Sequence, residues 1–160
     1  MAVDMFMKIG ALNGESKDSA KTKWIDVLAW SWGMSNSGSA QVGGGAGAGK
    51  VNVQDLSFTK WIDKTSPMLM LACCNGKHFD TANLVVRKAG ENPLEYLKIK
   101  MEDCLISSVD TGGAGEQDRL METVTLNFAT VHVDYTPQKA DGSGDAATNM
   151  GWDIAANQKV

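Results

Sequence analysis

The chain has 160 residues, of which 43% are hydrophobic and 21% are charged, and its formal net charge is -4. This length is typical of one domain, and this composition is that of a folded protein rather than a disordered one. The lysines are scattered and no apolar run approaches the roughly 20 residues of a membrane-spanning helix, so binding to nucleic acid and membrane insertion are not expected.

Alternating side chains predict the first two strands. Residues Val3 to Ile9 alternate with a period of two and end at Gly10, and the run from Trp24 to Trp32 is β-branched and aromatic. The bulky face of the second run is expected in the core, which leaves its smaller face for another role. The bulky face consists of Trp24, Leu28, Trp30 and Trp32, and the smaller face of Ile25, Val27, Ala29 and Ser31.

A glycine-rich segment over residues 34–50 has almost nothing to bury and is expected to project as an extended loop within the domain. Strand character returns at 51–53 and 56–61. The apolar run from Pro67 to Cys74 predicts a helix, with Ser66 as N-cap and Gly76 at its end. Because this helix is apolar nearly all round, it is expected to be packed on most sides, most simply against the sheet.

Three further strands are predicted at 81–88, 94–109 and 120–135. The apolar phase of the last strand shifts near Ala129, which indicates a bulge or a corner. Six or so strands and one helix predict a mainly β (α+β) fold, a small antiparallel β-barrel with one short helix packed on its side. Residues 138–160 are expected to form a polar, mobile C-terminal tail with room for a short terminal strand.

Two loops suggest ligand chemistry but fail in detail. Residues 44–50 have the spacing of a phosphate-binding loop, but Val51 stands where a hydroxyl must hold magnesium, and a strand follows instead of a helix. Asp141 begins the alternation of a calcium loop that lacks the required Gly and Glu. No nucleophile elbow and no local carboxylate pair occurs, so the sequence predicts no catalytic residue, no metal and no cofactor.

The cysteines Cys73, Cys74 and Cys104 are odd in number in a chain large enough to fold without disulfides, so reduced thiols are expected. Burial as small hydrophobic groups is favoured over a metal site with His78, because structural zinc normally uses ligands in closely spaced pairs. The first residues, 1–4, lack the basic and apolar parts of a secretory signal, so folding in the cytoplasm is expected.

A set of short segments, in their order and spacing, is typical of one family. These are Met1–Phe6, Lys8–Gly10, Ile25–Ser35, Gln54–Lys60, Ile62–Lys64, Leu71–Cys73, Gly76–His78, Arg87–Gly90, Val124–Ala129, Val133–Tyr135 and Pro137–Gly142. With them the chain resembles the Hcp family, the tube-forming proteins of the bacterial type VI secretion system. It departs from the family at Cys74, where a small hydroxyl residue is expected, and in the tail beyond Gly142.

The resemblance implies a subunit that assembles as a homohexameric ring, stacks ring on ring into a tube, and carries toxic effectors in its lumen. The implied partners are these effectors, a VgrG-type spike and a contractile sheath, in a Gram-negative host, with export by the machine itself. Long sheet edges are expected to be covered by a neighbour's strand, closing the ring by a heterologous contact.

Two sets of residues are then assigned by hypothesis. The face of Ala29 and Ser31 is the candidate lumen wall, because short side chains leave room for cargo. The glycine-rich loop resembles the family's extended loop that reaches a neighbouring ring. Its candidate stacking residues are Gly43, Gly44, Gly45, Gly47, Gly49 and Lys50. The alternative function is a soluble monomeric β-barrel module that binds a small ligand, and an enzyme built on the glycine-rich loop comes third.

Overall fold

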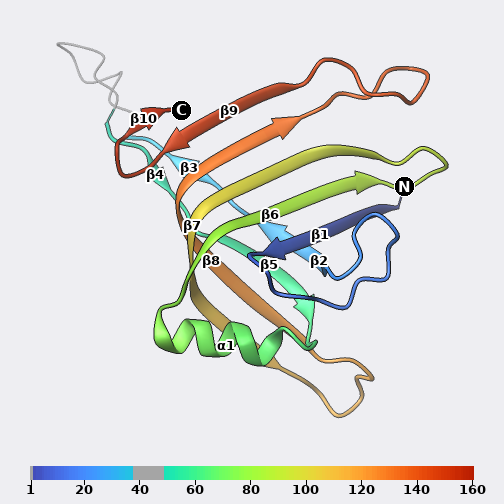
Figure 1. The fold of residues 1–160 in the computed structure, drawn as a ribbon, viewed down its shortest axis with the longest axis vertical. Helices are drawn as coiled ribbons and strands as arrows, with labels where there is room; N and C mark the ends of the chain where they lie inside the picture. Colours follow the sequence, from blue (N-terminus) through green and yellow to red (C-terminus); the bar gives the residue numbers. More distant parts are fainter. Residues whose placement is uncertain (1, 38–48) are drawn as a thin grey trace.

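The structure, a computed structural model, describes residues 2–37 and 49–160. Strands dominate it, and one helix follows the fifth strand (Figure 1). Within the described ranges, no helix has the length and apolar character needed to cross a membrane. The elements are β1 (Val3–Ile9), β2 (Ile25–Ser31), β3 (Met34–Ser35), β4 (Asn52–Val53), β5 (Leu56–Trp61), α1 (Ser66–Asn75), β6 (His78–Lys88), β7 (Leu94–Gly112), β8 (Met121–Tyr135), β9 (Thr148–Asp153) and β10 (Gln158–Lys159).

The main sheet closes into a barrel. Its strands pair in the order β8-β5-β2-β1-β6-β7, and β7 pairs again with β8 to complete the circuit. The predicted fold, a mainly β protein with a small antiparallel barrel and one short helix at its side, is therefore confirmed (Figure 1). Closure gives each barrel strand two neighbours within the chain. Open edges remain, because β1 pairs with β2 only at Phe6 and Met7, and β10 pairs only with Trp152 and Asp153 of β9. The expectation that a neighbour's strand covers an edge stays a prediction.

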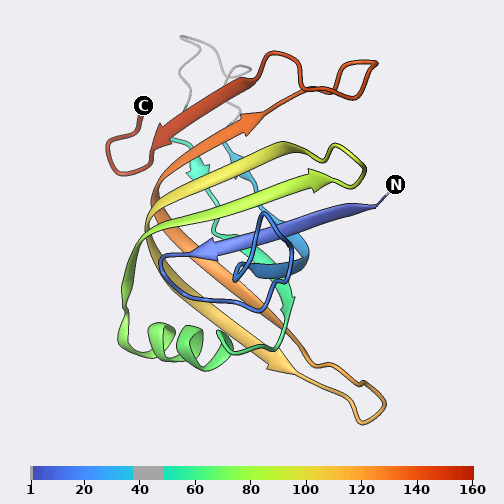
Figure 2. The ribbon, with the colours of Figure 1, turned by 45° about the vertical axis from the view of Figure 1, so that its right-hand side comes forward.

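The two longest strands, β7 and β8, run through both halves of the barrel and turn a corner together (Figure 2). In β8 every second side chain is buried up to Phe128, and the next buried one is Val131, three residues on. The paired part of β7 has the same three-residue step, from Met101 to Cys104. The register is unchanged at this point, and Asp103 adopts a left-handed backbone with φ 54°. The phase shift expected near Ala129 is thus a corner shared by two strands.

The predicted faces of β2 are half wrong. Ile25 and Val27, assigned to the outer face, are buried, whereas Leu28 is 36% exposed. A register shift between Val27 and Ala29 adds a residue to β2 opposite β5 and reverses its phase. Beyond it, Trp30 packs against the core as expected. The core that these strands enclose includes Met7, Ile9, Ile25, Phe58, Leu84, Met101, Leu126 and Val131.

Helix α1 lies against β7 at the lower end of the molecule (Figure 1). Its N-cap is Thr65 rather than the expected Ser66, and Pro67 stands in its first turn. Gly76 ends it in the left-handed conformation, with φ 67°, as predicted. The helix buries only one side, contrary to the expectation that it is packed on most sides. The buried residues are Ser66, Leu69 and Ala72.

A buried ion cluster links the first turn of α1 to the barrel. The Lys60 Nζ atom lies 2.5 Å from the Glu122 Oε1 atom, and both side chains have 0% exposure. The same ammonium donates a hydrogen bond to the Ser66 hydroxyl at 3.1 Å and pairs with Asp63 at 3.1 Å. Because Ser66 also donates to Glu122, one hydroxyl links strand, helix and carboxylate.

The C-terminal segment is more ordered than the mobile tail that the sequence suggested. Within residues 138–160, strand β9 pairs with β8 from Thr130 to Tyr135, and β10 pairs with β9. Trp152 and Ile154 pack against the core. Most of the segment is polar, and these two apolar side chains attach it to the end of the barrel sheet.

Candidate functional site: a strip of small side chains and the base of a loop

Four neighbouring strands place small side chains on the outer face of the barrel. Across β2, β5, β8 and β7, the register aligns Ser31, Ser57, Thr125 and Ser108 in one row. Residues that are directly paired in a sheet share a face, so these side chains stand together. The Ser57 and Thr125 hydroxyls are hydrogen-bonded at 2.9 Å.

A second row lies beside the first, two residues away from it on each strand. It aligns Ala29, Thr59, Thr123 and Asp110. The Thr59 and Thr123 hydroxyls lie 3.4 Å apart, a longer and weaker contact than that in the first row. The two rows together are called the small-residue strip below. Its members are Ala29, Ser31, Ser57, Thr59, Ser108, Asp110, Thr123 and Thr125.

The strip is a thin polar layer over a packed interior. Between its two rows, Trp30, Phe58 and Val124 point the other way, and the last two are buried to 1% and 0% exposure. Ala29 and Ser31, the two residues assigned from sequence, are both exposed. Short side chains held by a rigid sheet make a smooth surface without an apolar patch.

Sequence reasoning found two members of the strip and missed the rest. The signal was present, because Ser57 and Thr59 in β5, and Thr123 and Thr125 in β8, alternate with residues that are buried and mostly apolar. A period of two that places hydroxyls on one face predicts an outer surface of this kind. What the sequence did not contain is the register that brings the four strands together.

The base of the glycine-rich loop is a two-stranded sheet. Strand β3 pairs with β4, with Met34 opposite Val53. Gly49 lies next to the Ser37 side chain, whose hydroxyl would have to rotate away to make room for a Cβ atom at position 49. Lys50 is exposed next to it. Of the loop residues named from sequence, Gly43, Gly44, Gly45 and Gly47 lie outside the described residues.

The thiols differ in environment. Cys104 is buried in the core, where burial raises its thiol pKa to about 12, so that it stays protonated. Cys73 is half-buried and Cys74 is exposed on α1. His78 donates a hydrogen bond from Nδ1 to the Asp103 carboxylate at 3.0 Å, and both side chains are exposed. In residues 2–37 and 49–160, no three His, Cys, Asp or Glu side chains are grouped to hold a metal ion.

A family model and a curated relative both match most of this chain. A family model described as "Type VI secretion system effector, Hcp" matches residues 6–135. A curated relative from Pseudomonas aeruginosa, "Protein hcp1", is 64% identical over 159 residues, which is 98% of each chain.

Two solved structures share the fold over their whole length. One, described as "Structure of a type six secretion system protein", is 30% identical with a TM-score of 0.94, and the match covers 99% of this chain and 100% of that one. The crystal structure of Hcp1 from Salmonella typhimurium is 37% identical with a TM-score of 0.80, and the match covers 100% of both chains.

Proposed function

This chain belongs to the Hcp family of type VI secretion tube proteins, and from that premise we propose that it assembles as hexameric rings that stack into a tube and carry effectors in the lumen. In this proposal the work of the protein is assembly and transport rather than catalysis. The proposed partners are further copies of the chain, effector proteins, a VgrG-type spike and a contractile sheath. Rings assemble in the cytoplasm and leave through the machine.

The small-residue strip is the observation that carries this proposal. A passage for varied cargo needs a wall without long side chains that obstruct it and without apolar patches that hold cargo too tightly. The strip supplies such a wall over four strands, centred on Ala29, Ser31 and their paired hydroxyl residues. We therefore assign it to the lumen.

The loop over residues 34–50 is proposed to make contacts between stacked rings. Its described base supports this role, because the β3–β4 pair stands apart from the barrel sheet as a second sheet. Gly49 lies beside Ser37 at this base, and the exposed Lys50 next to it offers a charge to an adjoining ring. The proposed stacking residues remain Gly43, Gly44, Gly45, Gly47, Gly49 and Lys50.

Light scattering on the purified protein, with electron micrographs of the main peak, tests ring formation. We expect a species of six subunits that appears as a ring with an open centre. A clean monomer at micromolar concentration would reject the proposal and favour the monomeric module that binds a small ligand.

Replacement of Ser31 by arginine tests the lumen assignment. The long side chain is expected to reduce the effectors that co-purify with rings from the native host by about tenfold, the effect of one lost or blocked contact, while rings persist. The matched control is Ser19→Arg, which places the same side chain on the exposed loop before β2, away from the strip. Unchanged effector content in Ser31→Arg rings would refute the assignment.

A further inference from the structure

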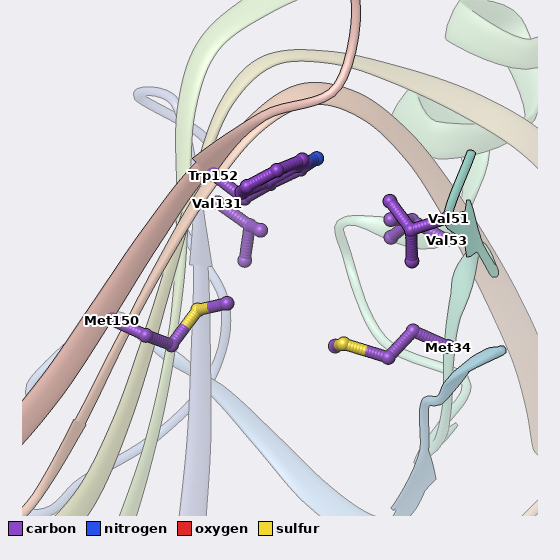
Figure 3. Close-up of a pocket in the computed structure, with 6 residues that line it drawn as sticks. All are labelled: Met34, Val51, Val53, Val131, Met150 and Trp152. Carbon is purple, nitrogen blue, oxygen red and sulfur yellow. The ribbon is translucent and has the colours of Figure 1, made fainter. Parts of the chain in front are cut away.

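An apolar pocket lies between the small β3–β4 sheet and the end of the barrel sheet (Figure 3). Its cavity volume is about 150 Å³. Its lining side chains are all apolar, and none of them belongs to the small-residue strip or to the proposed stacking residues. They are Met34, Val51, Val53, Val131, Met150 and Trp152.

Hydrogen bonds fix both walls of this pocket. The barrel wall is the pairing of β8 with β9, which places Val131 opposite Trp152. In the other wall, β3 pairs with β4, and the Gln54 N–H donates to the Gly33 carbonyl at 2.9 Å. The Trp32 Nε1–H donates to the Gln54 carbonyl at 2.8 Å. Because these bonds lie within one subunit, the pocket is formed before anything binds in it.

One hydrogen-bond donor at the pocket has no acceptor. The Trp152 Nε1 atom is buried, and among the described residues it has no hydrogen-bond partner. In Figure 3 this nitrogen lies at the tip of the indole ring, which extends into the gap towards Val51 and Val53. A buried N–H without an acceptor is costly, so an occupant that brings an acceptor to it gains a hydrogen bond.

The lining decides which kind of occupant fits. A buried water makes about three hydrogen bonds, whereas this pocket offers one donor among apolar walls, so water is held poorly. A charged group is also disfavoured, because no lining side chain carries a charge to pair with it. An apolar cavity of about 150 Å³ holds a molecule of the size of benzene. The flexible side chains of Met34 and Met150, which are 46% and 39% exposed, adapt to the shape of such a ligand.

We propose that this pocket binds a small uncharged molecule, an apolar ring or branched chain of about six or seven non-hydrogen atoms that carries one carbonyl or ether oxygen. The apolar part fills the space between the two sheets, and the oxygen accepts a hydrogen bond from the Trp152 Nε1–H. The site lies within one subunit, so it goes beyond the proposed tube function and does not depend on assembly.

Two probes of similar size test the class of ligand. Cyclohexanone and methylenecyclohexane differ only in a C=O group that replaces a C=CH₂ group. Calorimetric titration of the full-length protein, in the assembly state in which it purifies, should show saturable binding of the ketone to each subunit. Trp152→Phe keeps an aromatic ring but lacks the N–H. In this variant the ratio of the two affinities should shift against the ketone by about fivefold, the contribution of one hydrogen bond.

Filling the pocket tests the location of the site. Val53→Phe places an aromatic side chain in the space and should weaken the binding of both probes by about tenfold or more. The matched control is Val3→Phe, because Val3 is 41% exposed on β1 and does not line the pocket, so binding should be unchanged. Circular dichroism checks that each variant is folded, and Val51→Phe replaces Val53→Phe if the latter is not.

The results distinguish a ligand site from other occupants. Ketone binding that Val53→Phe removes, and that Trp152→Phe weakens relative to the hydrocarbon, supports the proposal. The proposal is wrong if neither probe binds, if binding survives in Val53→Phe, or if the affinity ratio is unchanged in Trp152→Phe. If dissociated subunits bind the probes and rings do not, a second copy of the chain fills the pocket on assembly. The ligand site is then rejected, and the tube function stands.

Discussion

The exposed side of helix α1, formed by Met68, Met70 and Leu71 and called the α1 knob below, is chemically opposite to the small-residue strip. The strip presents alanine, serine and threonine with one aspartate, Asp110, in paired rows, whereas the knob presents methionine and leucine. Short hydroxyl side chains do not attract apolar partners, whereas exposed long apolar side chains do. The two surfaces therefore differ in chemistry, one polar with short side chains and the other apolar with long side chains.

The interactions that hold the two surfaces in place also differ. The strip belongs to the barrel sheet itself and lies over Phe58 and Val124 of the core. The knob is carried on a helix whose first turn is held by the ion cluster of Lys60 and Glu122. The position of the knob therefore depends on a buried polar network, and that of the strip on apolar packing. The following experiments test this difference.

Removal of one ion partner should have the largest effect. Lys60→Met leaves the Glu122 carboxylate buried without its cation, which costs about 3–5 kcal/mol of unfolding free energy. Urea unfolding measures it, with all variants compared at the same protein concentration because assembly adds to the apparent stability. The double change Lys60→Met with Glu122→Leu should recover much of the loss, because no charge is then left buried. No recovery would show that the cluster acts through more than its charges.

A smaller loss is expected within the strip. Ser57→Ala removes the 2.9 Å hydrogen bond to Thr125 and should cost about 0.5–1.5 kcal/mol. Thr123→Val, at the 3.4 Å pair with Thr59, is the matched change at a weaker bond and should cost less. Urea unfolding of both at the same protein concentration ranks them. If Ser57→Ala lowered the free energy of unfolding as much as Lys60→Met does, or more, the proposed difference between the interactions that hold the two surfaces would be wrong.

The strip can also be made apolar like the knob. In Ala29→Leu with Ser31→Leu, both exposed side chains become large and apolar, with a change in stability within about 0.5 kcal/mol. We expect rings to persist and to bind more of a dye that senses apolar surface, such as ANS, than unaltered rings do. Loss of rings would mean that the strip takes part in subunit contact.

The smallest effect concerns an ion pair that belongs to neither surface. The Arg87 guanidinium hydrogen-bonds Asp18 and lowers the pKa of that carboxyl from 3.8 to about 2. A pKa lowered in the folded state stabilises the protein above about pH 4, and this contribution is lost as the pH falls towards 2. Thermal unfolding of Asp18→Asn should therefore show a shallower loss of stability between pH 4 and pH 2. An unchanged slope would assign the acid sensitivity to other carboxylates.

Several elements were predictable because their signals are local. The alternation in β1, the Pro67 and Gly76 boundaries of α1, and the phase shift near Ala129 each depend on a few neighbouring residues. The faces of β2 were only half predictable, because the register shift after Val27 depends on how β5 pairs with it. The order of residues 138–160 was missed because it rests on Trp152 and Ile154 reaching a distant core.

The sequence by itself determined the fold class, the helix and the family resemblance, since these follow from local pattern and motif order. Only the tertiary structure decided that β7 meets β8 to close the barrel, that the register shift in β2 turns Ala29 and Ser31 outwards while Ile25 and Val27 are buried, and that hydroxyls from separate strands align in one strip. It alone also left one side of α1 uncovered. The reason is that register, closure and burial arise from contacts between residues far apart in the chain, which no short stretch of sequence specifies.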